Sequence, residues 1–413
     1  MIWHVWLKNT LKFVLVLALT LPFSCNAQKD EPQFKPIPAA QNIDTYLPLL
    51  QGKKVGLVAN QTSVITSDIG DEIKLTHLAD TLQERGVQLQ KVFAPEHGFR
   101  GTADAGAHID NGIDKKTGLP LISLYGTHKK PLPEDLSDIN LMVFDIQDVG
   151  ARFYTYISTL HYVMEACAEQ NIPVIVLDRP NPNAHYIDGP VLKEVFKSFV
   201  GMHPVPIVYG MTIGEYAQMI NGELWLNKEI KADLVIIPVE NYSHDTPYSL
   251  PIAPSPNLRS DQAIALYPSL CLFEGTPISA GRGTDRPFEL FGAPDLDPIN
   301  YPFTFKPEAG PGAQFPKFKN ERCQGLDLGS ISPPNSIELK WLIDSYRAIS
   351  QQPSSDASSF FNNFFDKLAG TDQLRKDLVA GLSAEKIRSG WYEELQAFKI
   401  IRAKYLLYPE KRE

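Results

Sequence analysis

The chain has 413 residues, of which 43% are hydrophobic and 21% are charged. This composition supplies an ordinary buried core, argues against global disorder, and at this length predicts about two domains. The formal net charge is −9 and no stretch clusters basic residues, which argues against nucleic acid as a partner, because proteins that bind it present basic surfaces.

The N-terminal residues have the pattern of an export signal. Lys8 and Lys12 precede the apolar run at 13–23, which is too short to span a bilayer as a helix. The segment SCNAQ that follows allows two interpretations, namely cleavage after Ala27 or lipidation of Cys25. In both cases we expect a periplasmic or secreted protein, which meets a membrane only if Cys25 carries a lipid.

Changes in composition along the sequence divide the chain into four parts. We expect a signal peptide at 1–27, a polar and proline-bearing linker at 28–44, a Rossmann-like catalytic domain at 45–245, and a smaller α+β domain at 246–413.

In the part from residue 45, apolar runs alternate with amphipathic segments. The apolar runs predict strands at 53–60, 89–98, 120–126, 139–150, 172–182 and 232–241. Helical spacing predicts helices at 73–86, 155–171 and 212–226, the last opened by a capping box of Thr212 and Glu215. The strands are continuous apolar runs, which indicates a parallel sheet buried on both faces. We therefore predict an α/β, Rossmann-like layer structure.

From about residue 246, proline and glycine become frequent. Helical segments then follow at 336–350, 357–369, 371–381 and 391–406. This pattern predicts a smaller α+β domain whose loops face the first domain.

Polar residues follow several of the predicted strands. In parallel sheets, ligands bind outside the carboxyl ends of the strands, so these residues are expected to gather along one edge. They are Asn60 after the first strand, Glu96 and His97 after the second, Asp145 and Asp148 at the fourth, and Asn181 after the fifth. We expect Asn60, Arg100 and Asn181 to contact a substrate at this edge.

Motifs for common cofactors are absent from the sequence. The first strand is followed by GLVANQTS and not by GxGxxG, and the sequence contains neither a Walker motif nor GxSxG. Acidic residues and one histidine could converge on a metal, but they lack HExxH spacing. We therefore expect neither a cofactor nor a metal, and a metal-dependent hydrolase remains an alternative.

The stretch FAPEHGFRGT at 93–102 is the strongest candidate for catalysis. Glycoside hydrolysis uses one carboxylic acid to protonate the leaving oxygen and a second group as base or nucleophile. Glu96 follows an apolar strand, and burial raises the pKa of a carboxyl group, which suits a general acid. Asp145 and Asp148 are candidates for the second carboxylate. The structural alternatives are an ion pair of Glu96 with Arg100, a merely orienting role for His97, and a loop-bracing role for Asp145.

Other residues have the character of sugar ligands. Arg152, Tyr154 and Tyr156 follow a glycine turn, and aromatic rings with polar tips suit a pyranose ring. Their structural alternative is to fill the first turn of a helix. In the second domain, the candidates are Asn257, Arg282, Arg286 and Glu289. Arginines bind carboxylates through paired hydrogen bonds, so two arginines in a glycine-rich loop favour an anionic substrate over a structural ion pair.

Several of these motifs occur together, in the same order, in one known family. The segments APEHGFRG, DIQDVGARFYTYISTL, DRPNPN, PSPNLRS and FEGTPISAGRGTDRPFELFGAP resemble the exo-β-N-acetylmuramidases of the NamZ type, formerly a domain of unknown function. The resemblance runs from about residue 45 to the C-terminus. It differs at the segment VYG, where many relatives carry His before the glycine and this chain has Tyr209.

The resemblance implies a secreted or periplasmic hydrolase without a cofactor, with a Rossmann-like N-terminal domain, a smaller C-terminal domain and the active-site cleft between them. Such an enzyme releases N-acetylmuramic acid from the non-reducing ends of peptidoglycan glycan fragments, so peptidoglycan-derived glycans or muropeptides are its expected partners. It implies Glu96 as the catalytic acid and makes the arginines of GRGTDR suitable partners for the lactyl carboxylate. The second catalytic group stays open between Asp145, Asp148 and the 2-acetamido group of the substrate. A non-catalytic protein that binds cell-wall sugars remains an alternative.

Overall fold

The computed structural model describes residues 35–69, 72–100, 111–351 and 360–410. The predicted signal peptide, Cys25 and the first part of the predicted linker, at 28–34, lie outside the described residues. No helix among those that are described is both long and apolar enough to cross a membrane.

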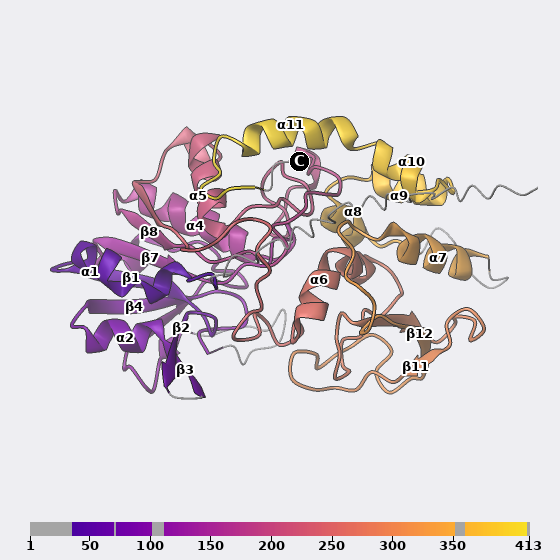
Figure 1. The fold of residues 1–413 in the computed structure, drawn as a ribbon, viewed down its shortest axis with the longest axis horizontal. Coiled ribbons are helices and arrows are strands. Elements are labelled where there is room, and N and C mark those ends of the chain that lie inside the picture. Colours follow the sequence, from indigo (N-terminus) through magenta and orange to yellow (C-terminus); the bar gives the residue numbers. More distant parts are fainter. Residues whose placement is uncertain (1–34, 70–71, 101–110, 352–359, 411–413) are drawn as a thin grey trace, which may run out of the picture. The chain divides into compact units, whose positions relative to one another are not determined.

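Seven strands form the main sheet, in the order β5-β6-β4-β1-β7-β8-β9 (Figure 1). All neighbouring strands are parallel except β5 and β6. The strands are β1 (Lys54–Ala59), β4 (Gln88–Ala94), β5 (Gly112–Ile113), β6 (Pro120–Ser123), β7 (Leu141–Asp145), β8 (Val174–Leu177) and β9 (Leu234–Ile237). The six predicted strands and the parallel α/β architecture are thus confirmed.

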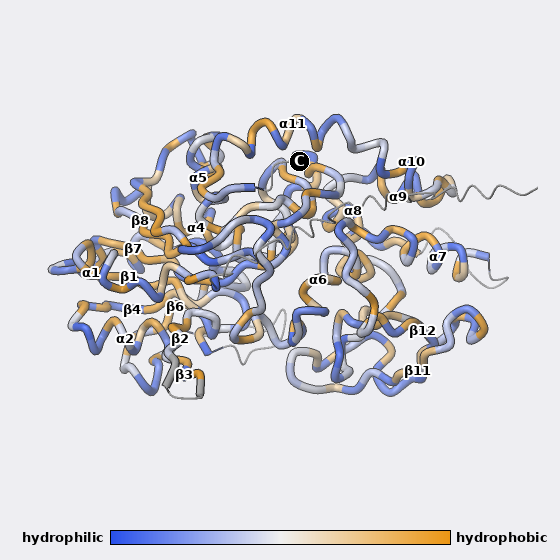
Figure 2. Tube along the Cα trace, in the orientation of Figure 1, coloured by the Kyte–Doolittle hydropathy of each residue, from blue (hydrophilic) through white to orange (hydrophobic). Residues whose placement is uncertain are grey.

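The central strands β1, β7 and β8 are buried on both faces. This burial explains why they are continuous apolar runs, and Figure 2 shows them as mostly hydrophobic. Successive side chains of a strand point to opposite faces. On β7, Leu141 and Val143 pack with residues of α1 (Ile43–Leu50) and α2 (Leu78–Glu84). Met142 and Phe144 belong to the core shared with α4 (Tyr156–Glu169) and α5 (Ile213–Gly222). One pair of helices therefore covers each face.

The predicted capping box at the start of α5 is confirmed. The Thr212 hydroxyl accepts a hydrogen bond from the backbone N–H of Glu215, and the Glu215 carboxylate accepts one from the N–H of Thr212 at 2.9 Å. These bonds fix the first turn of α5, because they satisfy amides that have no partner within the helix.

The helix predicted at 73–86 is wrong in its first half. Residues Glu72–His77 form β3, which pairs with β2 (Val64–Ile69) in an antiparallel hairpin, and α2 begins only at Leu78. Ile73 and Leu75 are 66% and 39% exposed, so they do not belong to a core-facing helical stripe. Strand pairing with the segment just before them satisfies their backbone, and this local partner outweighs the helical spacing of the apolar residues.

The C-terminal part combines a small antiparallel sheet with helices. The strands β10 (Leu290–Ala293), β11 (Phe303–Phe305) and β12 (Cys323–Asp327) lie in the order β10-β12-β11. The helices are α6 (Asp261–Leu270), the short 3-10 helix η4 (Cys271–Gly275), α7 (Leu339–Ser350), α8 (Asn363–Ala369), α9 (Gln373–Val379), α10 (Ala384–Ser389) and α11 (Tyr392–Arg402). The expected α+β character is confirmed, and α6, η4 and α10 are additions to the predicted helices.

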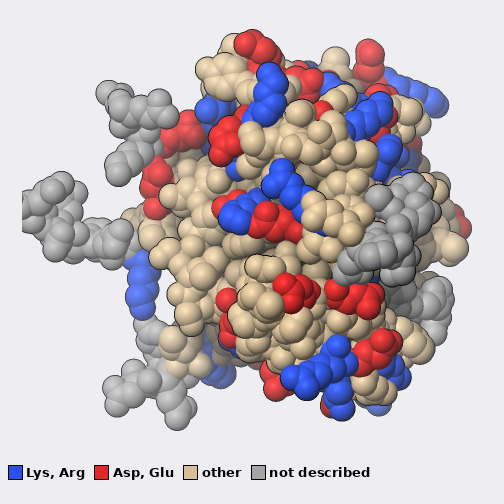
Figure 3. All heavy atoms as spheres, turned by 90° about the vertical axis from the view of Figure 1, so that its right-hand side faces the viewer, with Lys and Arg blue, Asp and Glu red and all other residues tan. Residues whose placement is uncertain are grey.

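Residues 35–413 form one compact unit. The end of the chain returns to the main sheet, where the Tyr408 hydroxyl donates to the carboxylate of Asp178 at 2.6 Å. On the face of the molecule shown in Figure 3, Lys and Arg side chains are interspersed with Asp and Glu. This face presents mixed charge and no extended basic patch.

Candidate active site

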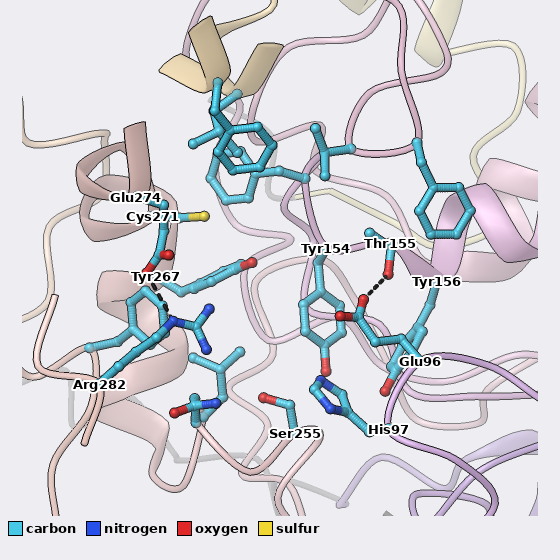
Figure 4. A pocket seen from close by; sticks show the side chains of 18 of the residues that line it. Glu96, His97, Tyr154, Thr155, Tyr156, Ser255, Tyr267, Cys271, Glu274 and Arg282 are labelled. Atoms are coloured by element: carbon cyan, nitrogen blue, oxygen red, sulfur yellow. Dashed lines mark hydrogen bonds and ion pairs between the residues drawn. The ribbon is translucent and has the colours of Figure 1, made fainter. Parts of the chain in front are cut away.

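A cavity of about 260 Å³ lies beyond the carboxyl ends of β4, β6 and β7. Residues after these strands form one wall, and residues of the C-terminal part form the other (Figure 4). The lining residues of the first wall include Glu96, His97, Tyr125, Tyr154, Thr155, Tyr156 and Phe199, and those of the second include Ser255, Asn257, Tyr267, Cys271, Glu274, Arg282 and Phe288. The expected position at the carboxyl edge of the sheet therefore holds a cavity of the size that a sugar ring needs.

Glu96 is held in this cavity by two hydroxyl groups. The Tyr125 hydroxyl donates to Oε1 of Glu96 at 2.9 Å, and the Thr155 hydroxyl donates to Oε2 at 2.8 Å. Hydroxyl groups can donate to a carboxylate or accept from a protonated carboxylic acid. The same arrangement therefore suits both protonation states that a general acid passes through.

His97 occupies a strained position next to Glu96. Its φ angle is 70°, a left-handed conformation that costs a residue with a side chain about 1 kcal/mol or more. Gly98 follows with φ 77°, and its N–H bonds the carbonyl of Pro95 at 3.0 Å. This tight turn reverses the chain directly after β4, which places two consecutive polar side chains on the cavity wall.

An ion pair forms the opposite wall. Nε of Arg282 donates to the carboxylate of Glu274 at 2.9 Å, and the guanidinium lies 5.0 Å from the centre of the Phe288 ring. Figure 4 shows the terminal nitrogens of Arg282 directed into the cavity. Burial raises the pKa of Glu274, but the charges of Arg282 and Lys317 outweigh it and hold that pKa below its usual range. Glu274 is therefore a carboxylate that orients Arg282.

Tyrosine rings line the cavity between these walls. The hydroxyls of Tyr154 and Tyr156 both donate to the carbonyl of Pro254, at 2.8 and 3.2 Å. Their rings meet edge to face at 4.8 Å, and the Tyr154 ring lies 5.9 Å from that of Tyr267. Burial raises the pKa of both phenols. The phenols are thus neutral, and their hydroxyls donate to the backbone. Their rings therefore form the surface that faces the cavity.

Asp145 does not line the cavity. It is fully buried and forms two hydrogen bonds with the guanidinium of Arg179, at 2.6 and 2.9 Å. A carboxylate bound on both oxygens by an arginine has its charge neutralised in place. Asp145 is thus held by a buried ion pair with the Arg179 side chain, and not by the backbone amides that a loop-bracing acid would bind.

Asp148 also lies behind the cavity wall and not on it. It is 2% exposed, and one oxygen accepts hydrogen bonds from the Tyr209 hydroxyl and, at 2.8 Å, from the backbone N–H of Gly150. Burial raises the pKa of Asp148 to about 6, against the opposing effect of these bonds. Tyr209, at the position where the family resemblance leads us to expect His, is therefore a partner of this buried acid.

Arg152 is fully buried and away from the cavity surface. Its guanidinium donates to four backbone carbonyls, which belong to Pro190, Val205, Leu368 and Ala369. Because the last two belong to α8, Arg152 joins the segment after β7 to the C-terminal part. Its placement is that of a structural cation whose positive charge is dispersed over carbonyl dipoles.

The remaining predicted residues also divide into those that line the cavity and those that bind other parts of the protein. Arg100 pairs with Asp114 at 2.8 Å and with Asp80 at 3.6 Å. Asn60 and Asn181 are buried beneath the cavity. Three residues of the second domain also have defined partners: Arg286 pairs with Asp327, Glu289 accepts from Ser260, and Asn257, which does line the cavity, donates to the carbonyl of Gly312.

The structure adds cavity residues that the sequence did not single out. Tyr125, Thr155 and Glu274 each contact a predicted site residue directly. Thr155 lies within the stretch that supplied Tyr154 and Tyr156, and Glu274 lies eight residues before Arg282. Nothing in their spacing marks them as partners, because each is brought to the cavity by a different segment of the chain, Glu274 by η4.

Comparison with known proteins identifies the family. Models of the N-terminal and C-terminal regions of the exo-beta-N-acetylmuramidase NamZ match residues 55–262 and 265–408. The chain belongs to the NamZ family. It is accordingly a glycoside hydrolase, an exo-β-N-acetylmuramidase.

Individual relatives of the NamZ family agree along most of the chain. The peptidoglycan beta-N-acetylmuramidase NamZ of Bacillus subtilis (strain 168) is 40% identical over 385 residues, which cover 89% of this chain and 90% of that protein. Two DUF1343 family proteins of Bacteroides fragilis NCTC 9343 have crystal structures with TM-scores of 0.81 and 0.73, at 42% and 29% identity. Each covers 92% of this chain over its own whole length.

Proposed function

We propose that the protein releases N-acetylmuramic acid from the non-reducing ends of peptidoglycan glycan fragments, with Glu96 as the general acid. The observation that carries this proposal is the Glu96 carboxyl group, held between two hydroxyls at the wall of an aromatic-lined cavity. The name of the Bacillus subtilis relative, which acts on peptidoglycan, supports the substrate class. Proton donation to the leaving oxygen from this position lowers the barrier to cleavage of the glycosidic bond.

Arg282 is the proposed ligand of the lactyl carboxylate. Its Nε is bound to Glu274, while its terminal nitrogens face the cavity (Figure 4). Guanidinium groups bind carboxylates through paired, charge-assisted hydrogen bonds. The arrangement distinguishes N-acetylmuramic acid from N-acetylglucosamine, which lacks the lactyl group.

For the second catalytic group, we propose the 2-acetamido group of the substrate. Asp145 and Asp148 lie behind the cavity wall, and Glu274 is committed to Arg282. The acetamido oxygen would attack the anomeric carbon while Glu96 gives its proton to the leaving oxygen. Water would then open the cyclic intermediate and return a proton to Glu96. Two displacements retain the configuration, so NMR during turnover should detect the β-anomer first.

We also propose that the protein acts after export, in the periplasm or outside the cell. The Lys8 and Lys12 residues before an apolar run at 13–23 support this location. Peptidoglycan-derived glycans or muropeptides are the partners that such a location offers to a muramidase.

The test is Glu96→Gln, which keeps the shape of the side chain and removes its acidic proton. We expect the thermal midpoint to be unchanged and kcat on a chromogenic β-N-acetylmuramide to fall about 1000-fold. Glu321→Gln, at an exposed position outside the cavity, is the matched control and should retain full activity. Retention of most activity by Glu96→Gln would exclude it as the acid.

Two further measurements separate the alternative functions. Binding of a muropeptide by the wild-type protein without turnover would favour a non-catalytic role. Loss of activity on treatment with EDTA would favour a metal-dependent hydrolase, whereas we expect activity to persist.

A further inference from the structure

A tight turn places two apolar side chains at the cavity. Ser198 and Gly201 exchange two backbone hydrogen bonds of 2.9 and 3.0 Å, so Phe199 and Val200 occupy the tip between them. Both tip residues line the cavity. Turn tips ordinarily carry Gly, Asn, Asp or Pro, because these residues suit the backbone conformation and the contact with water. A Phe-Val tip beside a cavity instead suits contact with a ligand.

Phe199 is the centre of a short aromatic strip, which we define as Tyr125, Phe199 and Tyr162 together with Lys129. The Phe199 and Tyr162 rings are stacked, with centroids 6.3 Å apart and planes inclined by 14°. The Tyr125 ring lies 6.3 Å from that of Phe199, with planes inclined by 58°. Nζ of Lys129 lies 4.6 Å from the centre of the Phe199 ring.

The turn that carries Phe199 is fixed to the sheet domain. The Ser158 hydroxyl, in the first part of α4, donates to the carbonyl of Phe199 at 2.7 Å. Because the backbone of the tip is anchored and its ring lies beside two tyrosine rings, the strip is a preformed surface. A preformed surface binds a ligand without the entropic cost of ordering side chains.

The strip begins at the proposed catalytic acid. Tyr125, its first member, donates to Oε1 of Glu96, whereas Arg282 lies on the opposite wall of the cavity (Figure 4). A general acid must lie within hydrogen-bond reach of the leaving oxygen. The sugar that leaves with this oxygen therefore lies on the side of Glu96, where the strip begins.

Lys129 supplies an uncommitted positive charge at the strip. Its neighbour Lys130 is paired with Glu165 at 2.6 Å and Glu169 at 2.8 Å. Within the described part of the chain, Lys129 has no carboxylate at ion-pair distance, and its ammonium group rests on the Phe199 ring alone. A cation in this state can bind a carboxylate without giving up an existing ion pair.

We propose that the aromatic strip is the binding site for the leaving-group side of the glycan. The first leaving sugar stacks on Phe199, and Lys129 binds a carboxylate carried further along the chain, from a lactyl group or from a peptide. This inference rests on the proposed function and extends it, because it makes the strip responsible for the preference for a glycan over a small leaving group.

The test compares two substrates that differ only in the leaving group. One is β-N-acetylmuramyl fluoride, whose leaving group is a single atom, and the other is the disaccharide N-acetylmuramyl-N-acetylglucosamine. We expect Phe199→Leu to lower the ratio of kcat/KM for the disaccharide to that for the fluoride about fivefold, through KM. Phe199→Trp, which restores a ring face, should recover most of the ratio.

The chain provides a matched control for this pair. Phe315, 89% exposed, lies beneath Lys319 in a similar arrangement, with Nζ 6.0 Å from the ring centre. Phe315→Leu and Lys319→Ala should leave the ratio unchanged. An equal loss on both substrates in Phe199→Leu would show a merely structural role and overturn the proposal, as would an unchanged ratio. Failure of the wild-type protein to cleave either substrate would instead overturn the proposed function.

Lys129 is tested with longer substrates. Lys129→Ala should lower kcat/KM about threefold for a tetrasaccharide with a second muramic acid, and leave the disaccharide ratio unchanged. A tetrasaccharide with amidated lactyl groups and one with a peptide distinguish the two sources of the carboxylate. A loss of the same size on the disaccharide, or no loss on any tetrasaccharide, would overturn the role of Lys129.

Discussion

The Arg282 side chain provides the sharpest test of substrate recognition. Arg282→Met removes the guanidinium while keeping an unbranched apolar chain over the Phe288 ring, from whose centre the guanidinium carbon lies 5.0 Å. If the terminal nitrogens bind the lactyl carboxylate, the variant should lose activity on N-acetylmuramides much more than on the matching N-acetylglucosaminide, which lacks this group.

The expected magnitude follows from the contacts of the arginine. Nε is bound to Glu274 at 2.9 Å, which leaves the terminal nitrogens for substrate. Hydrogen bonds to charged groups contribute about 1.5–3 kcal/mol. Their loss lowers kcat/KM on the muramide about 10- to 150-fold, at about 1.4 kcal/mol for each factor of ten. In the Arg282→Met variant, the carboxylate of Glu274 has lost its arginine partner. Its negative charge would then also repel the lactyl carboxylate of the substrate.

The assay measures kcat/KM on an aryl β-N-acetylmuramide and on the matching β-N-acetylglucosaminide. The double variant Glu274→Gln/Arg282→Met separates the lost attraction by Arg282 from the new repulsion by Glu274. Arg286→Met is the matched control, since that arginine belongs to the same loop, pairs with Asp327 and does not line the cavity. Equal losses on both substrates in Arg282→Met, or a similar selective loss in Arg286→Met, would refute the carboxylate role.

Two further predictions concern Thr155, which binds the proposed acid Glu96, and the buried Asp148. Thr155→Val removes the hydroxyl bound to Oε2 of Glu96 at 2.8 Å; steady-state kinetics should show kcat reduced about tenfold, whereas Thr127→Val at an exposed site should match wild type. For Asp148, burial raises the pKa to about 6 from 3.8, so its protonated form favours folding. The stability it contributes is complete below pH 3.8 and lost as pH rises through about 6, a change of about 3 kcal/mol. The free energy of unfolding, measured in urea at pH 4 and 7.5, should lose this pH-dependent contribution in Asp148→Asn. An unchanged pH dependence of stability in the variant would show that Asp148 is not its source.

Much of the fold was predictable because its signals are local. The continuous apolar runs of β1, β7 and β8 indicated strands buried on both faces, and the Thr212–Glu215 pair marked the start of α5. The β2–β3 hairpin was not predictable in this way. Leu75 has helical spacing relative to Leu78 and Leu82, and only pairing with β2 determines that it lies in a strand.

The candidate site likewise combines features that the sequence predicts with features that only the tertiary structure shows. The sequence by itself determined that polar side chains gather at the carboxyl edge of a parallel sheet, and it indicated Glu96, His97, Tyr154, Tyr156, Asn257 and Arg282, all of which line the cavity. It could not separate these from Asp145, Asp148 and Arg152, because a buried structural ion or hydrogen bond needs the same residue types as a catalytic one. The tertiary structure decided between them by giving Arg179 to Asp145 and four carbonyls to Arg152. It also brought Tyr125, Thr155 and Glu274 to the cavity from separate segments of the chain, since proximity in space depends on packing that no local pattern records.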